Sequence, residues 1–310
     1  MIGRVLAAAF GLALLQAPRT QSAQAPATAP APQHILQQQV ALDRAGYSPG
    51  EIDGAIGLNT ERALQAYSRD GGSIEALSGD PLTRYRISDE DAAGPFTTQI
   101  PDDLMAQASL PALNYRDVYE AVGERFHASP GLLRQLNPDS RFVAGEEILV
   151  PNVGNVVQPV GPPRGTQTGG ANPADVIVTV RRSSSSLTIA DGAGHTLFYA
   201  PVTTGSEHDP LPIGDWKVTG ILRNPEFHYN PELFWDADPA HSKATIKPGP
   251  NNPVGLVWID LSRPHYGLHG TPEPSLVGKT TSHGCVRLTN WDAMKTASLV
   301  RAGSRVVFAE

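Results

Sequence analysis

The sequence predicts a multidomain protein in which a mainly β C-terminal domain follows a small helical domain and a small α+β domain. Three observations support this. The 310 residues exceed one average domain. Apolar residues recur with helical spacing before residue 152 and form β-rich runs after residue 173. The 30 glycines and 28 prolines are many for one seamless domain, and they gather in linkers and turns, which favours three domains.

The charge and cysteine content exclude several classes of protein. With 24 basic and 31 acidic residues, the net charge is −7, so no basic face is offered to nucleic acid or to an anionic membrane. Cys285 is the single cysteine, which excludes an internal disulfide and a zinc site built from several thiolates.

Residues 1–25 are predicted to be a signal peptide. Arg4 precedes an apolar run over 5–15 that is too short to span a bilayer, and small residues at 20–25 offer cleavage sites. A buried N-terminal helix is the alternative, but the Ala/Pro/Gln-rich stretch 16–33 has no amphipathic continuation. We therefore expect export to the periplasm or cell envelope, with no membrane span after cleavage. In such a compartment a lone thiol must be used or buried.

Segment 34–72 is predicted to form two helices around a turn at 48–50. The first helix ends at Gly46, and the second begins at Asn59 or Thr60 and ends before two glycines. Its pattern of Gly-Tyr, Asp-Gly and an apolar helix face resembles a small helical peptidoglycan-binding domain, and an unspecialised helical hairpin is the alternative. Segment 73–112 is expected to be an irregular connector with a short helix near 101–108.

Segment 113–152 is predicted to contain two helices and a strand. Ser129 and Pro130 suit the N-cap and first position of the second helix, and the strand covers 148–150. The run Leu-Asn-Pro at 136–138 and the apolar strand resemble a LysM module, a glycan-binding fold, although Tyr-Arg-Asp at 115–117 replaces its usual opening strand. The Gly/Pro/Gln/Thr-rich stretch 153–172 is predicted to be a linker.

Segment 173–310 is predicted to be mainly β with one helix at 290–301. The segment 223–253 is long, polar and rich in Pro and Asn, so it is either a functional lid or a mobile insertion. The strands are expected in β-branched and aromatic runs at 175–180, 186–190, 196–202, 216–221 and 256–261.

The residues able to carry chemistry lie within 265–287. This stretch contains three histidines, the cysteine and an arginine. A thiol is a weak nucleophile until a base or cation favours the thiolate, and a nearby histidine provides that base. Gly270 and Gly284 follow histidines, where a missing side chain allows close approach, and the amides of Gly284 and Cys285 are free to face an oxyanion.

Two other interpretations of these residues were weighed. Most free cysteines are small buried hydrophobes, but the neighbouring histidines and the predicted export favour a nucleophile. His265 and His269 have the spacing of a helical metal-binding pair, yet Pro264, Gly267 and Gly270 indicate strand and turn. We therefore expect neither a metal nor another cofactor.

The motif His-Gly-Thr at 269–271, with Gly278 and Ser-His-Gly-Cys-Val-Arg at 282–287, resembles the L,D-transpeptidase catalytic domain (YkuD family) over about 173–310. The resemblance implies a mainly β fold with Cys285 as nucleophile and His269 as proton acceptor and donor, oriented by the carbonyl of Gly270. It places the oxyanion hole at the amides of His283, Gly284 and Cys285. It also implies that Arg287 steadies the motif or a substrate carboxylate, and that Ser282 and His283 position the motif or the substrate.

The same resemblance implies the reaction. Cys285 would attack a peptidoglycan stem tetrapeptide, release D-Ala and pass the acyl group to an amine on a neighbouring stem, a lipoprotein lysine or a free D-amino acid. The expected partners are thus peptidoglycan stem peptides and glycan. Two alternatives stay open: an L,D-carboxypeptidase or endopeptidase, in which water is the acceptor, and a non-catalytic wall-binding protein with an inert Cys285.

Overall fold

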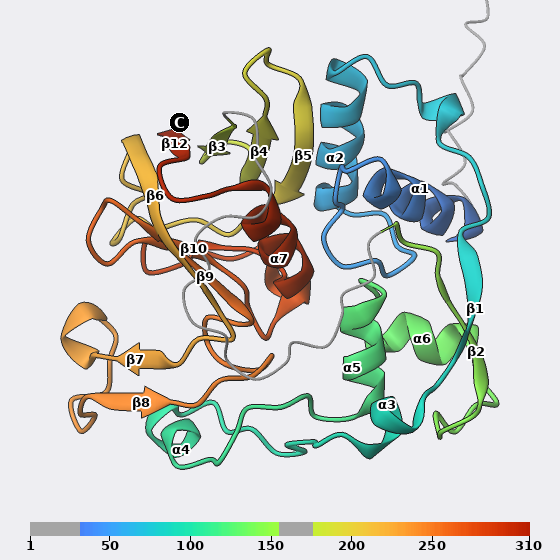
Figure 1. Ribbon diagram of the computed structural model, residues 1–310, viewed down its shortest axis with the longest axis horizontal. Coiled ribbons are helices and arrows are strands. Elements are labelled where there is room, and N and C mark those ends of the chain that lie inside the picture. The colour runs from blue at the N-terminus through green and yellow to red at the C-terminus, as the bar shows by residue number, and fades with distance from the viewer. Residues whose placement is uncertain (1–31, 155–175) are drawn as a thin grey trace, which may run out of the picture. The chain divides into compact units, whose positions relative to one another are not determined.

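A computed structural model describes residues 32–154 and 176–310 of the protein (Figure 1). The predicted signal peptide and most of the predicted linker at 153–172 lie outside these residues. The two described stretches belong to one compact unit. No helix in the described part of the chain is both long and apolar enough to cross a lipid bilayer.

The C-terminal part of the chain forms an eight-stranded mixed sheet, as the β-rich runs predict. Most neighbours are antiparallel, but β12 pairs with β3 and β10 pairs with β11 in parallel. In sheet order the strands are β11 (Val286–Arg287), β10 (Gly267–His269), β9 (Val257–Leu261), β6 (Gly214–Arg223), β12 (Arg305–Ala309), β3 (Ile177–Arg181), β4 (Ser186–Ala190) and β5 (Thr196–Pro201).

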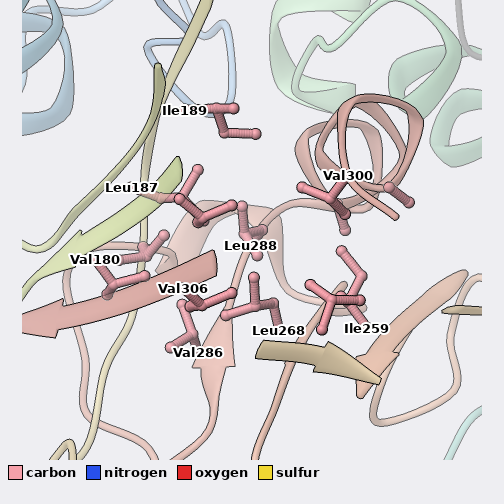
Figure 2. Packing of buried hydrophobic residues seen from close by; sticks show 14 of the residues in the cluster. Val180, Leu187, Ile189, Ile259, Leu268, Val286, Leu288, Val300 and Val306 are labelled. Carbon is pink, nitrogen blue, oxygen red and sulfur yellow. The ribbon is translucent and has the colours of Figure 1, made fainter. Parts of the chain in front are cut away.

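Helix α7 (Asn290–Leu299) packs against this sheet and completes its core. Thr289 caps the helix by accepting a hydrogen bond from the Asp292 amide at 3.1 Å. The helix ends at Leu299, before the predicted residue 301, because Val300 has an extended backbone. Figure 2 shows aliphatic side chains from the sheet and from the chain around α7 meeting in one apolar cluster, including Leu268 of β10 and Val286 of β11. This packing fixes the two strands that bracket the predicted catalytic motif.

The helices predicted before residue 152 are present, with boundaries close to those expected. Ser129 accepts the Leu132 amide at 3.0 Å, and Pro130 occupies the first turn of the helix it begins. The second predicted helix begins at Leu58, one residue before Asn59, with Gly57 as its N-cap. The four helices are α1 (Pro32–Arg44), α2 (Leu58–Arg69), α5 (Val118–Arg125) and α6 (Pro130–Leu136).

Segment 73–112 contains more regular structure than an irregular connector. It includes β1 (Leu82–Arg86), α3 (Asp89–Ala93) and α4 (Leu104–Ala108), the last within the stretch where a short helix is expected. Strand β1 pairs antiparallel with β2 (Glu147–Pro151), and Arg84 forms a 2.7 Å ion pair with Glu147. A strand therefore does precede the α+β segment, about thirty residues before Tyr115. Local pattern misses it because β1 is short and half exposed and its partner lies far along the chain.

Segment 223–253, predicted to be a lid or a mobile insertion, contains a two-stranded hairpin. Strands β7 (Phe227–Tyr229) and β8 (Ala244–Ile246) pair antiparallel, with the short 3₁₀ helix η2 (Pro231–Leu233) between them. We call residues 227–246 the β7–β8 hairpin. Strand β8 lies beside α4 (Figure 1). His241 in this hairpin lies 2.8 Å from the carboxylate of Asp103, the N-cap residue of α4. The segment is thus tied to a helix far earlier in the sequence.

Candidate active site

His269, at the end of β10, is held in one tautomer. Its ring is buried, and its Nδ1 lies 2.6 Å from the carbonyl oxygen of Gly270. Because a carbonyl only accepts, Nδ1 carries the proton and Nε2 keeps a free lone pair. The ring of Trp258 on β9 stacks on the imidazole at 5.5 Å between centroids, with 21° between the planes. His269 is therefore oriented as a proton acceptor would be.

The surroundings of His269 keep its imidazole neutral. Burial lowers its pKa to about 3, and the positive charge of Arg287 acts in the same direction. Only the hydrogen bond to Gly270 opposes these effects. At neutral pH the ring is therefore uncharged, and its Nε2 carries no proton.

Cys285 lies in the turn that leads into β11. Its Sγ donates a long hydrogen bond of 3.6 Å to the carbonyl of His265. Burial raises the pKa of this thiol, whereas the Gly267 amide and the charge of Arg287 act to lower it. The thiol is thus protonated at rest, and a thiolate forms only when a base accepts its proton.

The turn over 282–285 leaves three consecutive backbone amides without a hydrogen-bond acceptor among the described residues. The buried Ser282 hydroxyl donates to the Cys285 carbonyl at 2.6 Å, which closes the turn from inside. Gly284 has a φ of +100°, and an added Cβ would come within 2.8 Å of the Tyr266 ring. Within the described part of the chain, the backbone N–H groups of His283, Gly284 and Cys285 have no hydrogen-bond acceptor. They are free to donate to a developing oxyanion.

His283 connects this turn to the β7–β8 hairpin. Its Nε2 lies 2.8 Å from the carboxylate of Asp236, and its ring meets that of Phe234 edge-on at 5.0 Å. The hairpin therefore contacts the turn that carries the thiol, as a lid over the site requires.

Arg287 is the cation whose charge acts on both His269 and Cys285. Its amide donates to the Thr203 carbonyl at 2.9 Å, which fixes the backbone, and burial lowers the pKa of its guanidinium. Within residues 32–154 and 176–310, no carboxylate forms an ion pair with it. An arginine without a protein partner at the wall of a cavity is suited to bind an anionic group of a ligand.

A cavity of about 810 Å³ brings most of the predicted site residues together. Cys285, His269, His283 and Arg287 line it. Ser282, Gly270 and Gly284 do not line it, but Ser282 and Gly270 form hydrogen bonds to Cys285 and His269. The sequence analysis missed several further lining residues. These are Trp258, Tyr266 and Asp236 of the C-terminal part, and Asp102, Asp103 and Leu104 from the segment predicted as a connector.

Two further features bear on the sequence predictions. The aromatic residues of segment 223–253 form part of the cavity wall, because Phe227, Tyr229 and Phe234 line the cavity. Trp235 instead is 59% exposed.

His269 is in a strand, so its spacing from His265 is not helical. In the described residues, no group of three His, Cys, Asp or Glu side chains is arranged to hold a metal ion.

Comparison with known proteins gives matches over the same region. Residues 175–308 match the family model described as YkuD, the L,D-transpeptidase catalytic domain. A protein of Bacillus subtilis named "Putative L,D-transpeptidase YkuD" is 26% identical over 192 residues, covering 61% of this chain and 92% of its own. "Probable L,D-transpeptidase YbiS" of Escherichia coli K12 is 40% identical over 122 residues, covering 37% of this chain and 39% of its own.

A solved structure gives a similar but partial match. An L,D-transpeptidase from Mycobacterium smegmatis aligns over 44% of this chain and 58% of its own, with 19% identity and a TM-score of 0.35. Residues 175–308 are thus similar in sequence to the YkuD L,D-transpeptidase catalytic domain, and the mainly β fold expected for this part of the chain is confirmed. The likenesses of the preceding segments to peptidoglycan-binding and LysM modules stay predictions.

Proposed function

We propose that this protein, whose residues 175–308 match the L,D-transpeptidase catalytic domain, is an exported peptidoglycan L,D-transpeptidase that uses Cys285 as its nucleophile. One observation carries the proposal. Cys285 and a neutral His269 line the same cavity, and the Gly270 carbonyl leaves Nε2 of the imidazole free to accept the proton of the thiol.

The first half-reaction is acylation by a stem tetrapeptide. His269 Nε2 takes the thiol proton as Sγ bonds to the carbonyl carbon that precedes D-Ala. The resulting oxyanion accepts hydrogen bonds from the free amides of His283, Gly284 and Cys285. The C–N bond then breaks, the imidazolium returns its proton to the leaving amine, and D-Ala departs from a thioester. Arg287 is available to hold a substrate carboxylate during these steps.

The second half-reaction transfers the acyl group. An amine of an acceptor attacks the thioester while His269 takes the proton that the amine loses, and the released thiolate is reprotonated by the imidazolium. The acceptor is a neighbouring stem, a lipoprotein lysine or a free D-amino acid. With water in its place, the enzyme is a carboxypeptidase or endopeptidase.

Features outside the chemistry agree with a polymeric substrate. The segments resembling peptidoglycan-binding and LysM modules would tether the enzyme to the wall, which raises the effective concentration of stem peptides. The predicted signal peptide would deliver the chain to the same compartment.

The test is mass spectrometry of the protein incubated with tetrapeptide muropeptides or with imipenem, a β-lactam that acylates thiol nucleophiles. We expect one adduct on the wild type and none on Cys285→Ala. The exposed His195→Ala variant, on the turn between β4 and β5, serves as a control and should behave as wild type. An adduct on Cys285→Ala, or none on the wild type, overturns the proposal.

Product analysis then identifies the acceptor. Cross-linked dimers, or stems carrying an added D-amino acid, are expected from the transpeptidase. Trimmed monomers alone would assign the enzyme to the hydrolases instead.

A further inference from the structure

Asn290, the first residue of α7, packs against Gly270, the residue whose carbonyl orients His269. The side chain is fully buried. An added Cβ on Gly255 or Gly270 would come within 2.0 or 2.1 Å of its Oδ1, so the Asn290 amide occupies the space that two absent side chains leave open. Its Oδ1 also accepts a hydrogen bond from the Leu256 amide at 3.0 Å. A shift of the Asn290 side chain toward Gly270 would therefore displace the Gly270 backbone.

The other end of the Asn290 amide is held by a residue from outside the catalytic domain. Its Nδ2 donates to Oε2 of Glu124 at 3.1 Å and to the Pro250 carbonyl at 3.1 Å. Glu124 belongs to α5, about fifty residues before the region that matches the family, and only 8% of it is exposed. Its second oxygen accepts a hydrogen bond from the Tyr115 hydroxyl at 3.3 Å.

This arrangement selects one orientation of the Asn290 amide. A flipped amide would place its NH₂ against the Leu256 N–H, where two donors meet, and its oxygen against the Pro250 carbonyl, where two acceptors meet. Removal of the Glu124 carboxyl would leave one Asn290 donor without an acceptor and a void beside it. A buried group in that condition moves or takes in water, because an unmade buried hydrogen bond is costly.

We infer that Glu124 is a positioning residue for the base His269, acting through Asn290 on the backbone of Gly270, so that helix α5 sets the geometry of the catalytic domain. The inference rests on the proposed function, because it assigns Glu124 a role in the same proton transfer. Its chemical consequence is direct: displacement of the Gly270 carbonyl turns the imidazole and moves Nε2 away from the thiol proton.

The charge state of Glu124 agrees with this role. Burial raises the pKa of its carboxyl to about 8, and the charge of Glu120 acts in the same direction. The carboxyl is therefore neutral at neutral pH, and it brings no uncompensated charge to the back of the site. Glu124 also lines a cavity of about 180 Å³, whose other titratable groups are Glu51, Tyr115, Arg116, Glu120 and Glu273. A glutamine has the same shape and no charge, so it should replace Glu124.

The experiment measures acylation of the full-length protein by imipenem, with the maximal rate separated from the half-saturating concentration. For Glu124→Ala we expect the maximal rate to fall by about tenfold or more with half-saturation nearly unchanged, because a misplaced base slows chemistry and not binding. Glu124→Gln should restore the rate to near that of the wild type. Such rescue distinguishes positioning from a general loss of packing.

Ser48→Ala is the matched control. Ser48 is buried and donates at 3.0 Å to Asp292 on the same helix α7, but its contact does not reach Gly270. This variant should lose stability with little change in the acylation rate. If Glu124→Ala does not fold, Glu124→Met fills the space without an acceptor and should show the same slow acylation.

Two outcomes have different meanings. The inference is wrong if Glu124→Ala, or Glu124→Met in its place, is acylated as fast as Ser48→Ala. It is also wrong if Glu124→Gln is acylated as slowly as Glu124→Ala. In both cases the proposed function stands. If imipenem does not acylate the wild type, the proposed function fails and this inference fails with it.

Discussion

The raised pKa of Glu124 predicts a stability that depends on pH, and Glu124→Gln removes that dependence. Below about pH 4.5 the carboxyl is protonated in both states, so it contributes no difference. Between that pH and about 8 it is protonated when folded and ionised when unfolded, so stability falls as pH rises. Each pKa unit is worth about 1.4 kcal/mol, so the shift from 4.5 to about 8 costs the wild type about 5 kcal/mol at alkaline pH.

The measurement is urea unfolding of both proteins, followed by tryptophan fluorescence. From about pH 5 to about pH 8, the stability of Glu124→Gln should rise relative to the wild type by about 4 kcal/mol. Burial also raises the pKa of Asp292 and Glu51, each to about 7, but both proteins share these groups and the comparison cancels them. Glu61→Gln, at an exposed site on α2, should show no such trend. The reasoning is refuted if the difference in unfolding free energy between Glu124→Gln and the wild type is the same at both pH values.

Two further predictions concern the frame of the site. Gly284→Ala should destabilise the protein by about 1–3 kcal/mol and slow acylation of Cys285, because the residue has a φ of +100° and its Cβ would meet the Tyr266 ring at 2.8 Å. Thermal unfolding measures the loss of stability, and imipenem kinetics measure the rate of acylation. If Gly284→Ala is acylated as fast as the wild type, the turn tolerates a side chain and the prediction is wrong. Thr289→Ala should cost about 1–2 kcal/mol by removing the cap on the Asp292 amide. Thr289→Ser should recover most of that loss in urea unfolding, and equal losses in both variants would exclude the cap as the cause.

Local pattern was sufficient for elements whose formation depends on neighbouring residues. Ser129 and Pro130 specify the start of a helix through one side-chain acceptor and one fixed φ, and the structure has that helix. The β-branched runs became strands of one sheet for the same local reason. Strand β1 was missed because its pairing with β2 closes a loop of about sixty residues, and its half-exposed pattern carries no alternation.

The candidate site divides in the same way. The residues within 265–287 were recognisable because the thiol, the histidines and the glycines lie close in sequence. Their meeting in space depends on β10 and β11, which pair in parallel with Leu268 opposite Val286. Asp103 gave no signal because it reaches the cavity from a segment far earlier in the chain. Trp258 gave none because only the antiparallel pairing of β9 with β10 brings it opposite His269.

The sequence by itself determined the chemical groups available to this protein: one thiol, a histidine followed by glycine, and a glycine directly before the cysteine. Tertiary structure alone decided their state. Burial makes His269 neutral and keeps the Cys285 thiol protonated, and contacts across more than a hundred residues join Glu124 to Asn290 and His241 to Asp103. Protonation and orientation depend on solvent exclusion and long-range packing, and these arise only when the whole chain is folded.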